Sequence, residues 1–159
     1  MNSNWSLENK VALITGASKG IGLAIAEEFL SLGADVIVVA RNLNTLEQAF
    51  SHLKNEQKRI HLIAADVTDK SGRDALFKQA NELGKLDILV NNVGTNIRKK
   101  LVDYTTDELN SVLNTNLMSA LEITKAAFPL LVKGQNASVI FMSSMASFGS
   151  VIRCHLWCN

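Results

Sequence analysis

Cysteine is nearly absent from this chain of 159 residues: Cys154 and Cys158 are the only two, and both lie in the last six positions. A main body without cysteine has no disulfide framework and is typical of a reducing compartment. No apolar run approaches the roughly 20 residues that cross a bilayer, and residues 1–10 lack the apolar core of a signal peptide. We therefore expect a cytoplasmic protein that does not enter a membrane.

The chain also has almost no net charge and very little proline. Lys and Arg (16 residues) balance Asp and Glu (15 residues) to a net charge of +1, which disfavours a nucleic-acid surface or a polybasic membrane patch. Pro129 is the only proline, and there is no internal repeat, low-complexity stretch or linker. The apolar content of 47% supports a core without disulfides or metals, so we expect one domain over residues 1–159.

Short apolar runs alternate with amphipathic segments along the chain. Short, β-branched runs predict strands at 11–15, 35–40, 60–65, 86–90 and 138–142. Helical spacing predicts helices at 21–32, 43–55, 70–83 and 106–132. Continuous apolar strands in this alternation indicate an α/β protein with a doubly wound parallel sheet of Rossmann type. Ligands of such sheets bind at the carboxyl ends of the strands.

A glycine-rich loop follows the first predicted strand, with the residues Thr15-Gly16-Ala17-Ser18-Lys19-Gly20-Ile21-Gly22. Gly16 allows a sharp turn, Gly20 a close approach to pyrophosphate, and Gly22 close helix–strand packing. The free N–H groups and the dipole of the following helix favour phosphate charge. This context of strand, loop and helix favours nucleotide binding over an ordinary turn. The loop of nucleoside triphosphatases is disfavoured because no G-K-[ST] follows the glycines.

The spacing T-G-x-x-x-G-x-G resembles the short-chain dehydrogenase/reductase family. Arg41-Asn42 after the second predicted strand and the segment SSMASFG at 143–149 are most similar to its tropinone-reductase-like branch. Further motifs of that family follow in order, over about residues 8–152: Asp66-Val67, Asn91-Asn92-Val93-Gly94, Asn114-Thr115-Asn116-Leu117 and Ser143-Ser144. The resemblance implies a cofactor site made of Gly16, Ser18, Lys19, Gly20, Ile21, Gly22, Arg41, Asp66, Val67, Asn92 and Gly94. It also implies two catalytic residues: Ser144, which positions a substrate carbonyl, and Asn116, which holds a water in the proton relay.

Each of these positions also has an ordinary structural interpretation, and only the ordered set favours the functional one. Asp66 can cap the next loop, and Asn91 can tie strands together. Asn116 alone can be a packing residue in a helix. Ser144 alone can be a loop serine.

The residue after the second strand indicates the cofactor. Enzymes that use NAD usually place a carboxylate there to hold the ribose hydroxyls, whereas this chain has Ala40 followed by Arg41. An arginine can bind a 2′-phosphate through two parallel hydrogen bonds, and Ser18 and Lys19 stand within reach of the same group. NADP(H) is therefore favoured over NAD(H). The alternative is that Arg41 and Lys19 are solvated surface charges.

The catalytic tyrosine and lysine of the family have no counterpart in this chain. The family spacing places the tyrosine at position 157, where Trp157 stands, and the lysine beyond residue 159. Free tyrosine has a pKa of about 10 and needs the lysine to act near neutral pH, and an indole has no such proton. We expect an oxidoreductase of carbonyl or alcohol groups by family, with this copy inactive. The alternatives are a non-catalytic NADP(H)-binding module and a non-functional truncated product.

Residues 153–159 abandon the family pattern. Their reverse-translated codons, shifted by one base, can encode Gly-Ala-Ile-Tyr-Gly-Ala-Thr, the neighbourhood of the family's Tyr-x-x-x-Lys. We hypothesise an out-of-frame tail on a frameshifted, truncated chain, and encoding DNA without such a downstream frame would refute this. A metal site made of Cys154, His155 and Cys158 lacks a second ligand cluster, so no metal is predicted.

Truncation would leave the sheet incomplete at its C-terminal edge. The strand at 138–142 would then be an exposed apolar edge, and we expect poor solubility. The family forms dimers or tetramers with help from the helix at 106–132, an interface that a truncated chain would lack. Beyond a small-molecule carbonyl or alcohol substrate we expect neither nucleic acid nor membrane as partner, and substrate identity and reaction direction are not predicted.

Overall fold

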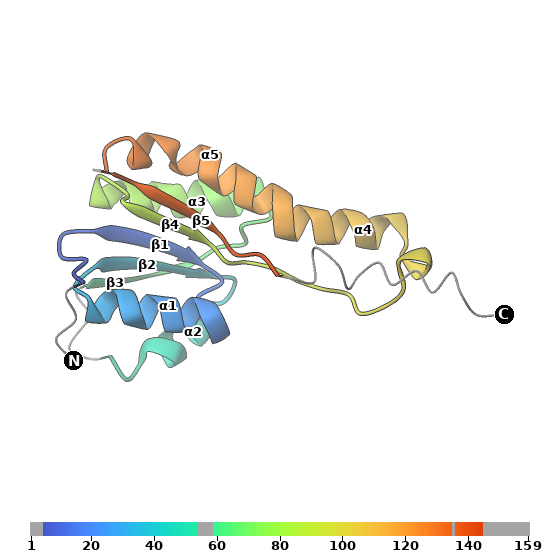
Figure 1. Cartoon of the computed structure of the whole chain (residues 1–159), viewed down its shortest axis with the longest axis horizontal. Helices are drawn as coiled ribbons and strands as arrows, with labels where there is room; N and C mark the ends of the chain where they lie inside the picture. The colour runs from blue at the N-terminus through green and yellow to red at the C-terminus, as the bar shows by residue number, and fades with distance from the viewer. Residues whose placement is uncertain (1–4, 54–58, 135, 145–159) are drawn as a thin grey trace.

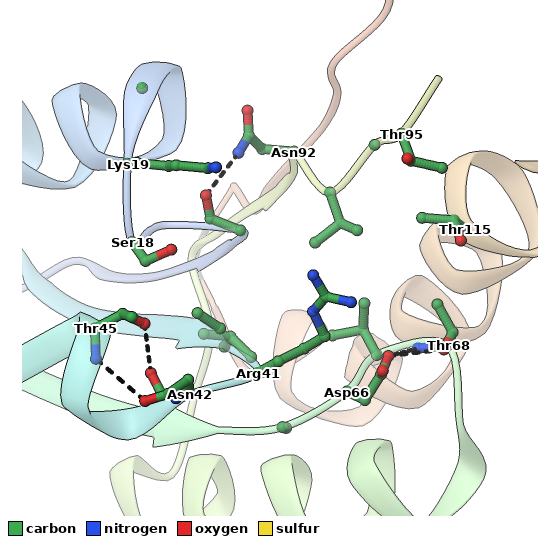
Figure 2. A pocket seen from close by; sticks show the side chains of 18 of the residues that line it. Ser18, Lys19, Arg41, Asn42, Thr45, Asp66, Thr68, Asn92, Thr95 and Thr115 are labelled. Carbon is green, nitrogen blue, oxygen red and sulfur yellow. Dashed lines mark hydrogen bonds between the residues drawn. The ribbon is translucent and has the colours of Figure 1, made fainter. Parts of the chain in front are cut away.

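A five-stranded parallel sheet forms the centre of the molecule, in the order β3-β2-β1-β4-β5. The computed structural model describes residues 5–53, 59–134 and 136–144. The strands are β1 (Val11–Thr15), β2 (Asp35–Ala40), β3 (Ile60–Ala64), β4 (Ile88–Asn91) and β5 (Ser138–Phe141). The carboxyl ends of β1 to β4 meet at one edge, where a cleft opens (Figure 2). The predicted doubly wound α/β sheet is confirmed.

Helices cover both faces of this sheet (Figure 1). One face carries α1 (Gly20–Ser31) and α2 (Leu43–Phe50). The other carries α3 (Lys70–Ala80), which continues as a short 3-10 turn (Asn81–Leu83), and α5 (Ser119–Leu131). None of the helices in the described ranges is long and apolar enough to cross a membrane.

Residues that alternate along the central strands enter two separate cores. Leu13 packs in the cluster under α3 and α5, and Ile14 packs in the cluster under α1 and α2. All five residues of β1 are buried, which is why its sequence is a continuous apolar run rather than an alternating one. Truncating one such leucine to alanine typically costs about 2–5 kcal/mol.

Several predicted boundaries differ from the observed ones, and two of these differences have clear local causes. The helix expected over 43–55 ends at Phe50, because turns close there through the Ser51 amide to Gln48 O and the Leu53 amide to Phe50 O. The strand expected from residue 86 begins at Ile88. The amide of Leu86 donates to Leu130 O of α5, so it is not available to the sheet.

The segment predicted as one long helix over 106–132 is helical from Thr106 to Leu131, but it contains a π-turn that was not predicted. The segment consists of α4 (Thr106–Leu113), a π-helical turn (Asn114–Met118) and α5. A capping box between Thr105 and Glu108 starts α4, and α4 extends beyond the end of the sheet (Figure 1). Single π-turns inside helices are frequent at functional sites, and this one contains Asn116.

The edge strand β5 differs from the other strands in its exposure. Within the described ranges it pairs only with β4. Its apolar side chains Val139, Ile140 and Phe141 are 38%, 40% and 50% exposed, and Met142 follows at 41%. The exposed apolar edge expected for 138–142 is therefore present, with no charged residue to discourage pairing with another chain.

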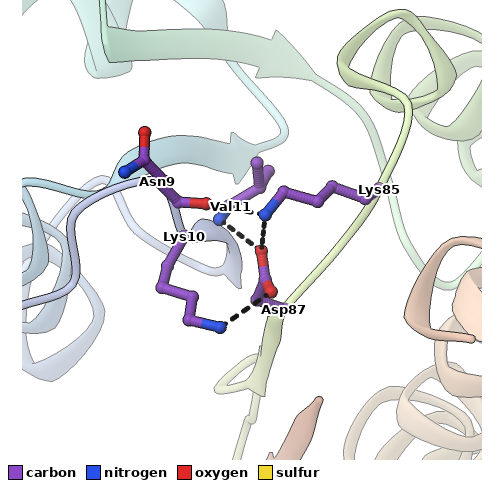
Figure 3. A network of polar contacts seen from close by, with 5 residues as sticks. All are labelled: Asn9, Lys10, Val11, Lys85 and Asp87. Carbon is purple, nitrogen blue, oxygen red and sulfur yellow. Dashed lines mark hydrogen bonds and ion pairs between the residues drawn. The ribbon is translucent and has the colours of Figure 1, made fainter. Parts of the chain in front are cut away.

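Asp87 joins the amino-terminal ends of β1 and β4 (Figure 3). Its side chain is 1% exposed and accepts hydrogen bonds from the Val11 amide (3.0 Å) and from the ammonium groups of Lys85 (2.9 Å) and Lys10 (3.2 Å). Burial raises the pKa of the carboxyl, but the hydrogen bonds from Lys85, Val11 and Lys10 outweigh burial, and the net pKa lies below its ordinary value. The carboxylate is therefore ionised at neutral pH.

We predict that Asp87→Asn destabilises the fold in a pH-dependent way. Because the folded pKa is lowered, the stabilisation is present above the unfolded pKa of about 3.9 and is lost as the pH falls through the folded pKa. The substitution should lower the free energy of unfolding by about 1–3 kcal/mol at pH 7, with a smaller loss at pH 3. Urea unfolding measures both values.

The control for this experiment is Asp74→Asn, since Asp74 pairs with Lys70 in an exposed ion pair on α3. We expect a change below about 0.5 kcal/mol there. If both variants lost the same free energy of unfolding, the buried Asp87 network would stabilise the fold no more than an exposed ion pair does.

A charge on the edge strand should reduce self-association. Phe141→Lys places an ammonium on β5, where it opposes strand pairing between chains. Light scattering at matched protein concentration measures the effect. Ser31→Lys adds the same charge at the exposed end of α1 and should leave aggregation unchanged. If both variants reduced aggregation equally, the cause would be the added net charge and not the β5 edge.

Candidate functional site

The cleft at the carboxyl ends of the strands has a volume of about 1250 Å³. It exceeds the usual range of about 300–1,000 Å³ for small-molecule pockets, which suits an elongated ligand. Four chain segments line it: the glycine-rich loop, the β2–α2 junction, the loop after β3 and the loop after β4. Thr115 of the π-turn completes the wall.

The glycine-rich loop has the backbone that its glycines predict. Gly16 and Gly20 adopt φ values of +67° and +60°, a region that side chains with a Cβ rarely adopt. A Cβ on Gly22 would lie 2.5 Å from Gly16 O and from the Asn92 side chain, so this glycine permits close packing. Gly20 has open space at its Cβ position, and it lines the cleft. The predicted residue Ile21 points elsewhere, with 62% exposure and no part in the lining.

Thr15 connects the glycine-rich loop to the loop after β4. Its hydroxyl accepts hydrogen bonds from the amides of Asn92 (3.0 Å) and Val93 (3.3 Å) and donates to Val90 O (3.4 Å). The Asn92 side-chain nitrogen donates in return to Thr15 O (3.0 Å) and Gly16 O (3.2 Å). Asn92 lines the cleft, but its NH₂ group is committed to the loop. This role of Thr15 was not predicted from the sequence, where the only signal was its place between a strand and a glycine.

Cationic and polar side chains gather at the β2 end of the cleft. Figure 2 shows the Arg41 guanidinium pointing into the cleft, and Ser18 and Lys19 line the opposite wall. Among the described residues, no carboxylate lies within ion-pair distance of Arg41. Asn42 caps α2 by accepting a hydrogen bond from the Thr45 amide (3.3 Å), and both also line the cleft. Asn42 and Thr45 were not predicted as part of the site, although asparagine before a helix is a capping signal.

Asp66 lies on the neighbouring wall, after β3. Its Oδ1 accepts hydrogen bonds from the Thr68 hydroxyl (2.7 Å) and the Thr68 amide (2.9 Å). These two bonds, aided by the charge of Arg41 and opposed by burial, hold the pKa of Asp66 below its ordinary value. The other oxygen has no hydrogen-bond partner among the described residues. Asp66 thus caps its loop and also lines the cleft, with Val67 beside it.

The two predicted catalytic residues do not line the cleft. Asn116 makes a reciprocal pair with the Thr95 backbone, accepting from its amide (2.7 Å) and donating to its carbonyl (2.8 Å). Gly94 lies next to this pair, since a Cβ there would be 3.7 Å from Asn116 Oδ1. Both polar ends of the Asn116 side chain are therefore occupied, and its relay role stays a prediction. Ser144 follows β5 at the same edge of the sheet.

The side chain of Asn91 bonds a helix, whereas its structural interpretation was a tie between strands. Its side-chain nitrogen donates to the Thr124 hydroxyl of α5 (3.1 Å). Its buried Oδ1 has no partner among the residues described. Trp157 and the Cys154, His155 and Cys158 set lie outside the described residues. In the remainder, no group of His, Cys, Asp and Glu could hold a metal.

Comparisons with known proteins agree with this geometry. The family model described as short chain dehydrogenase matches residues 10–157. Tropinone reductase homolog At2g29260, chloroplastic, of Arabidopsis thaliana is 43% identical over 92% of this chain and 46% of its own length. A tropinone reductase homolog of Datura stramonium is 35% identical over 89% of this chain and 54% of its own length.

A solved structure matches as well. A candidate short-chain alcohol dehydrogenase from Sinorhizobium meliloti 1021 superposes with a TM-score of 0.83 at 31% identity, over 91% of this chain and 57% of that one. The chain spans about half the length of the curated relatives it matches. On the family match, the sheet order and the cleft at its carboxyl edge, the chain belongs to the short-chain dehydrogenase family.

Proposed function

We propose that the chain binds NADP(H) in the cleft and represents the nucleotide-binding half of an oxidoreductase for carbonyl or alcohol groups. Members of the family bind a nicotinamide cofactor. The observation that carries the choice of NADP(H) is Arg41, a cation in the cleft at the end of β2 that makes no ion pair within the described part of the chain. A carboxylate at that point would repel a 2′-phosphate, whereas a guanidinium attracts one.

The walls of the cleft fit the parts of this cofactor. The start of α1 offers free N–H groups to a pyrophosphate, and Gly20 leaves open space for it. Ser18, Lys19 and Arg41 would hold the 2′-phosphate. The ionised Asp66 offers an unpaired oxygen to an amino group such as that of adenine, and Val67 offers an apolar surface beside it.

We further propose that the chain as given binds the cofactor without turnover. When bound, the cofactor supplies or accepts the hydride, and the family's tyrosine supplies the proton to the carbonyl oxygen. Trp157 stands at the tyrosine position and has no proton suited to this step. Ser144 and Asn116 are left to position a carbonyl and a water. The second candidate function, a non-catalytic NADP(H)-binding module, rests on the same cleft.

We also propose a cellular compartment and a class of partner for the chain. We place the chain in the cytoplasm, on its lack of cysteine before Cys154. One relative carries the word chloroplastic in its name, so imaging of a tagged chain decides the compartment. We propose a small-molecule substrate and no nucleic-acid partner. We propose that dimers or tetramers, which the family resemblance implies, form in longer members of the family and not from this chain.

Arg41→Ala tests the choice of cofactor. We expect the unmodified chain to bind NADPH more tightly than NADH in calorimetric titrations. Losing a charge-assisted contact should weaken NADPH binding by about 10–100-fold and leave NADH binding nearly unchanged. Arg98→Ala removes the same charge from an exposed residue outside the cleft and should change neither affinity. Equal loss for both cofactors would contradict the assignment of Arg41 to the 2′-phosphate.

Binding and turnover are separated by a second assay. We expect NADPH to bind but not to be oxidised in the presence of small ketones, followed by absorbance of the reduced nicotinamide. Oxidation above the rate without protein would show that Trp157 does not disable the chain. Absence of binding would reject the proposed function and favour a non-functional product.

A further inference from the structure

We propose that Arg73 of α3 is a positioning residue for the adenine end of the cleft, acting by orienting the peptide group that anchors Asp66. This inference rests on the proposed function, because it assigns a task to Asp66 in nucleotide binding. Arg73 is not part of the cleft lining and touches no ligand position. Its effect must therefore pass through the loop after β3.

A single peptide group links the two residues. The Arg73 guanidinium donates from Nη1 to the carbonyl oxygen of Val67 at 2.9 Å. The amide nitrogen of the same peptide belongs to Thr68, and it donates to Asp66 Oδ1 at 2.9 Å. In a trans peptide the C=O and N–H bonds point in opposite directions within one plane. Holding the carbonyl therefore also sets the direction of the N–H that anchors the carboxylate.

The charge of Arg73 strengthens this arrangement. Among the described residues Arg73 makes no ion pair, and the nearby Asp74 of the same helix is already paired with Lys70 at 2.6 Å. A cation on a carbonyl polarises the peptide and makes its N–H a better donor. The Thr68 amide bond is one of the causes of the lowered pKa of Asp66.

The first turn of α3 packs closely enough to transmit this constraint. A Cβ on Gly72 would lie 2.1 Å from the carbonyl oxygen of Asp66, so the helix backbone rests directly on the loop. Arg73 follows at the next position and reaches the adjacent carbonyl of Val67. The loop is thus held by backbone packing on one side and by a guanidinium on the other.

The consequence for binding concerns one atom of Asp66. Oδ1 is occupied by Thr68, so the other oxygen is available to accept a hydrogen bond from the cleft. The 6-amino group of adenine can donate that bond, whereas hypoxanthine has a carbonyl oxygen there. A correctly oriented Asp66 should therefore discriminate NADPH from its hypoxanthine analogue.

Titration of both dinucleotides against Arg73→Met tests the proposal. We expect the unmodified chain to prefer NADPH by about fivefold or more, as one hydrogen bond to a charged group allows. In Arg73→Met that preference should fall to about one, and Arg73→Lys should restore part of it. Lys70→Met removes an exposed cation from the same helix and should keep the preference. A parallel loss of both affinities in Arg73→Met, with the preference intact, would mean a merely structural role and would overturn the proposal.

Hydrogen exchange of the unliganded chain gives a second measurement. The Thr68 amide should exchange faster in Arg73→Met than in the unmodified chain, while amides in the body of α3 keep their protection. Unchanged exchange at Thr68 would overturn the proposal even if no dinucleotide binds. Absence of binding to the unmodified chain would instead reject the proposed function, so the two failures are distinguishable.

Discussion

The hydroxyl of Thr15 is the point on which the geometry of the cleft depends. It lies at the end of β1 and bonds the backbone of Val90, Asn92 and Val93, so segments about 75 positions apart in sequence are held at one place. The side chain of Asn92 returns two bonds to the glycine-rich loop. That return is possible only because Gly22 has no Cβ in the space where the amide lies. Thr15, Gly22 and Asn92 therefore together fix the position of the glycine-rich loop relative to the loop after β4.

The cleft carries positive charge at one end and negative charge at the other. Cations at the β2 end, Lys19 and Arg41, face space that a phosphate can fill, while Asp66 at the β3 end keeps its negative charge through Thr68. A ligand with a phosphate near one end and a hydrogen-bond-donating amino group at the other would suit both ends of the cleft. At the amino-terminal ends of the strands, Asp87 links β1 to β4 through hydrogen bonds and ion pairs. The strands that carry the cleft are thus held at both ends.

Local sequence signals predicted the parts of the site that depend on local structure. The sharp turn at Gly16, the alternation of strands and helices and the place of Arg41 follow from strand–loop–helix patterns that each lie within a short stretch of chain. The order of the strands was not predicted, because it depends on pairing between distant segments. The π-turn around Asn116 was not predicted, since it accompanies a side chain that bonds Thr95 across 21 positions. The contact of Arg73 with Val67 was missed because arginine on a helix surface has no distinctive pattern.

Burial differs between the centre of the sheet and its β5 side, and the cleft lies at the buried part. The strands β1 and β2, which carry the nucleotide loops, are covered on both faces, as a parallel sheet requires. Within the described ranges, β5 remains exposed, and so do Leu113 and Leu117 on the helical segment that extends beyond the sheet (Figure 1). Ser144 follows this uncovered strand. The proposed cofactor cleft is therefore built on elements that are packed on both faces, which fix the position of its walls without a contribution from β5.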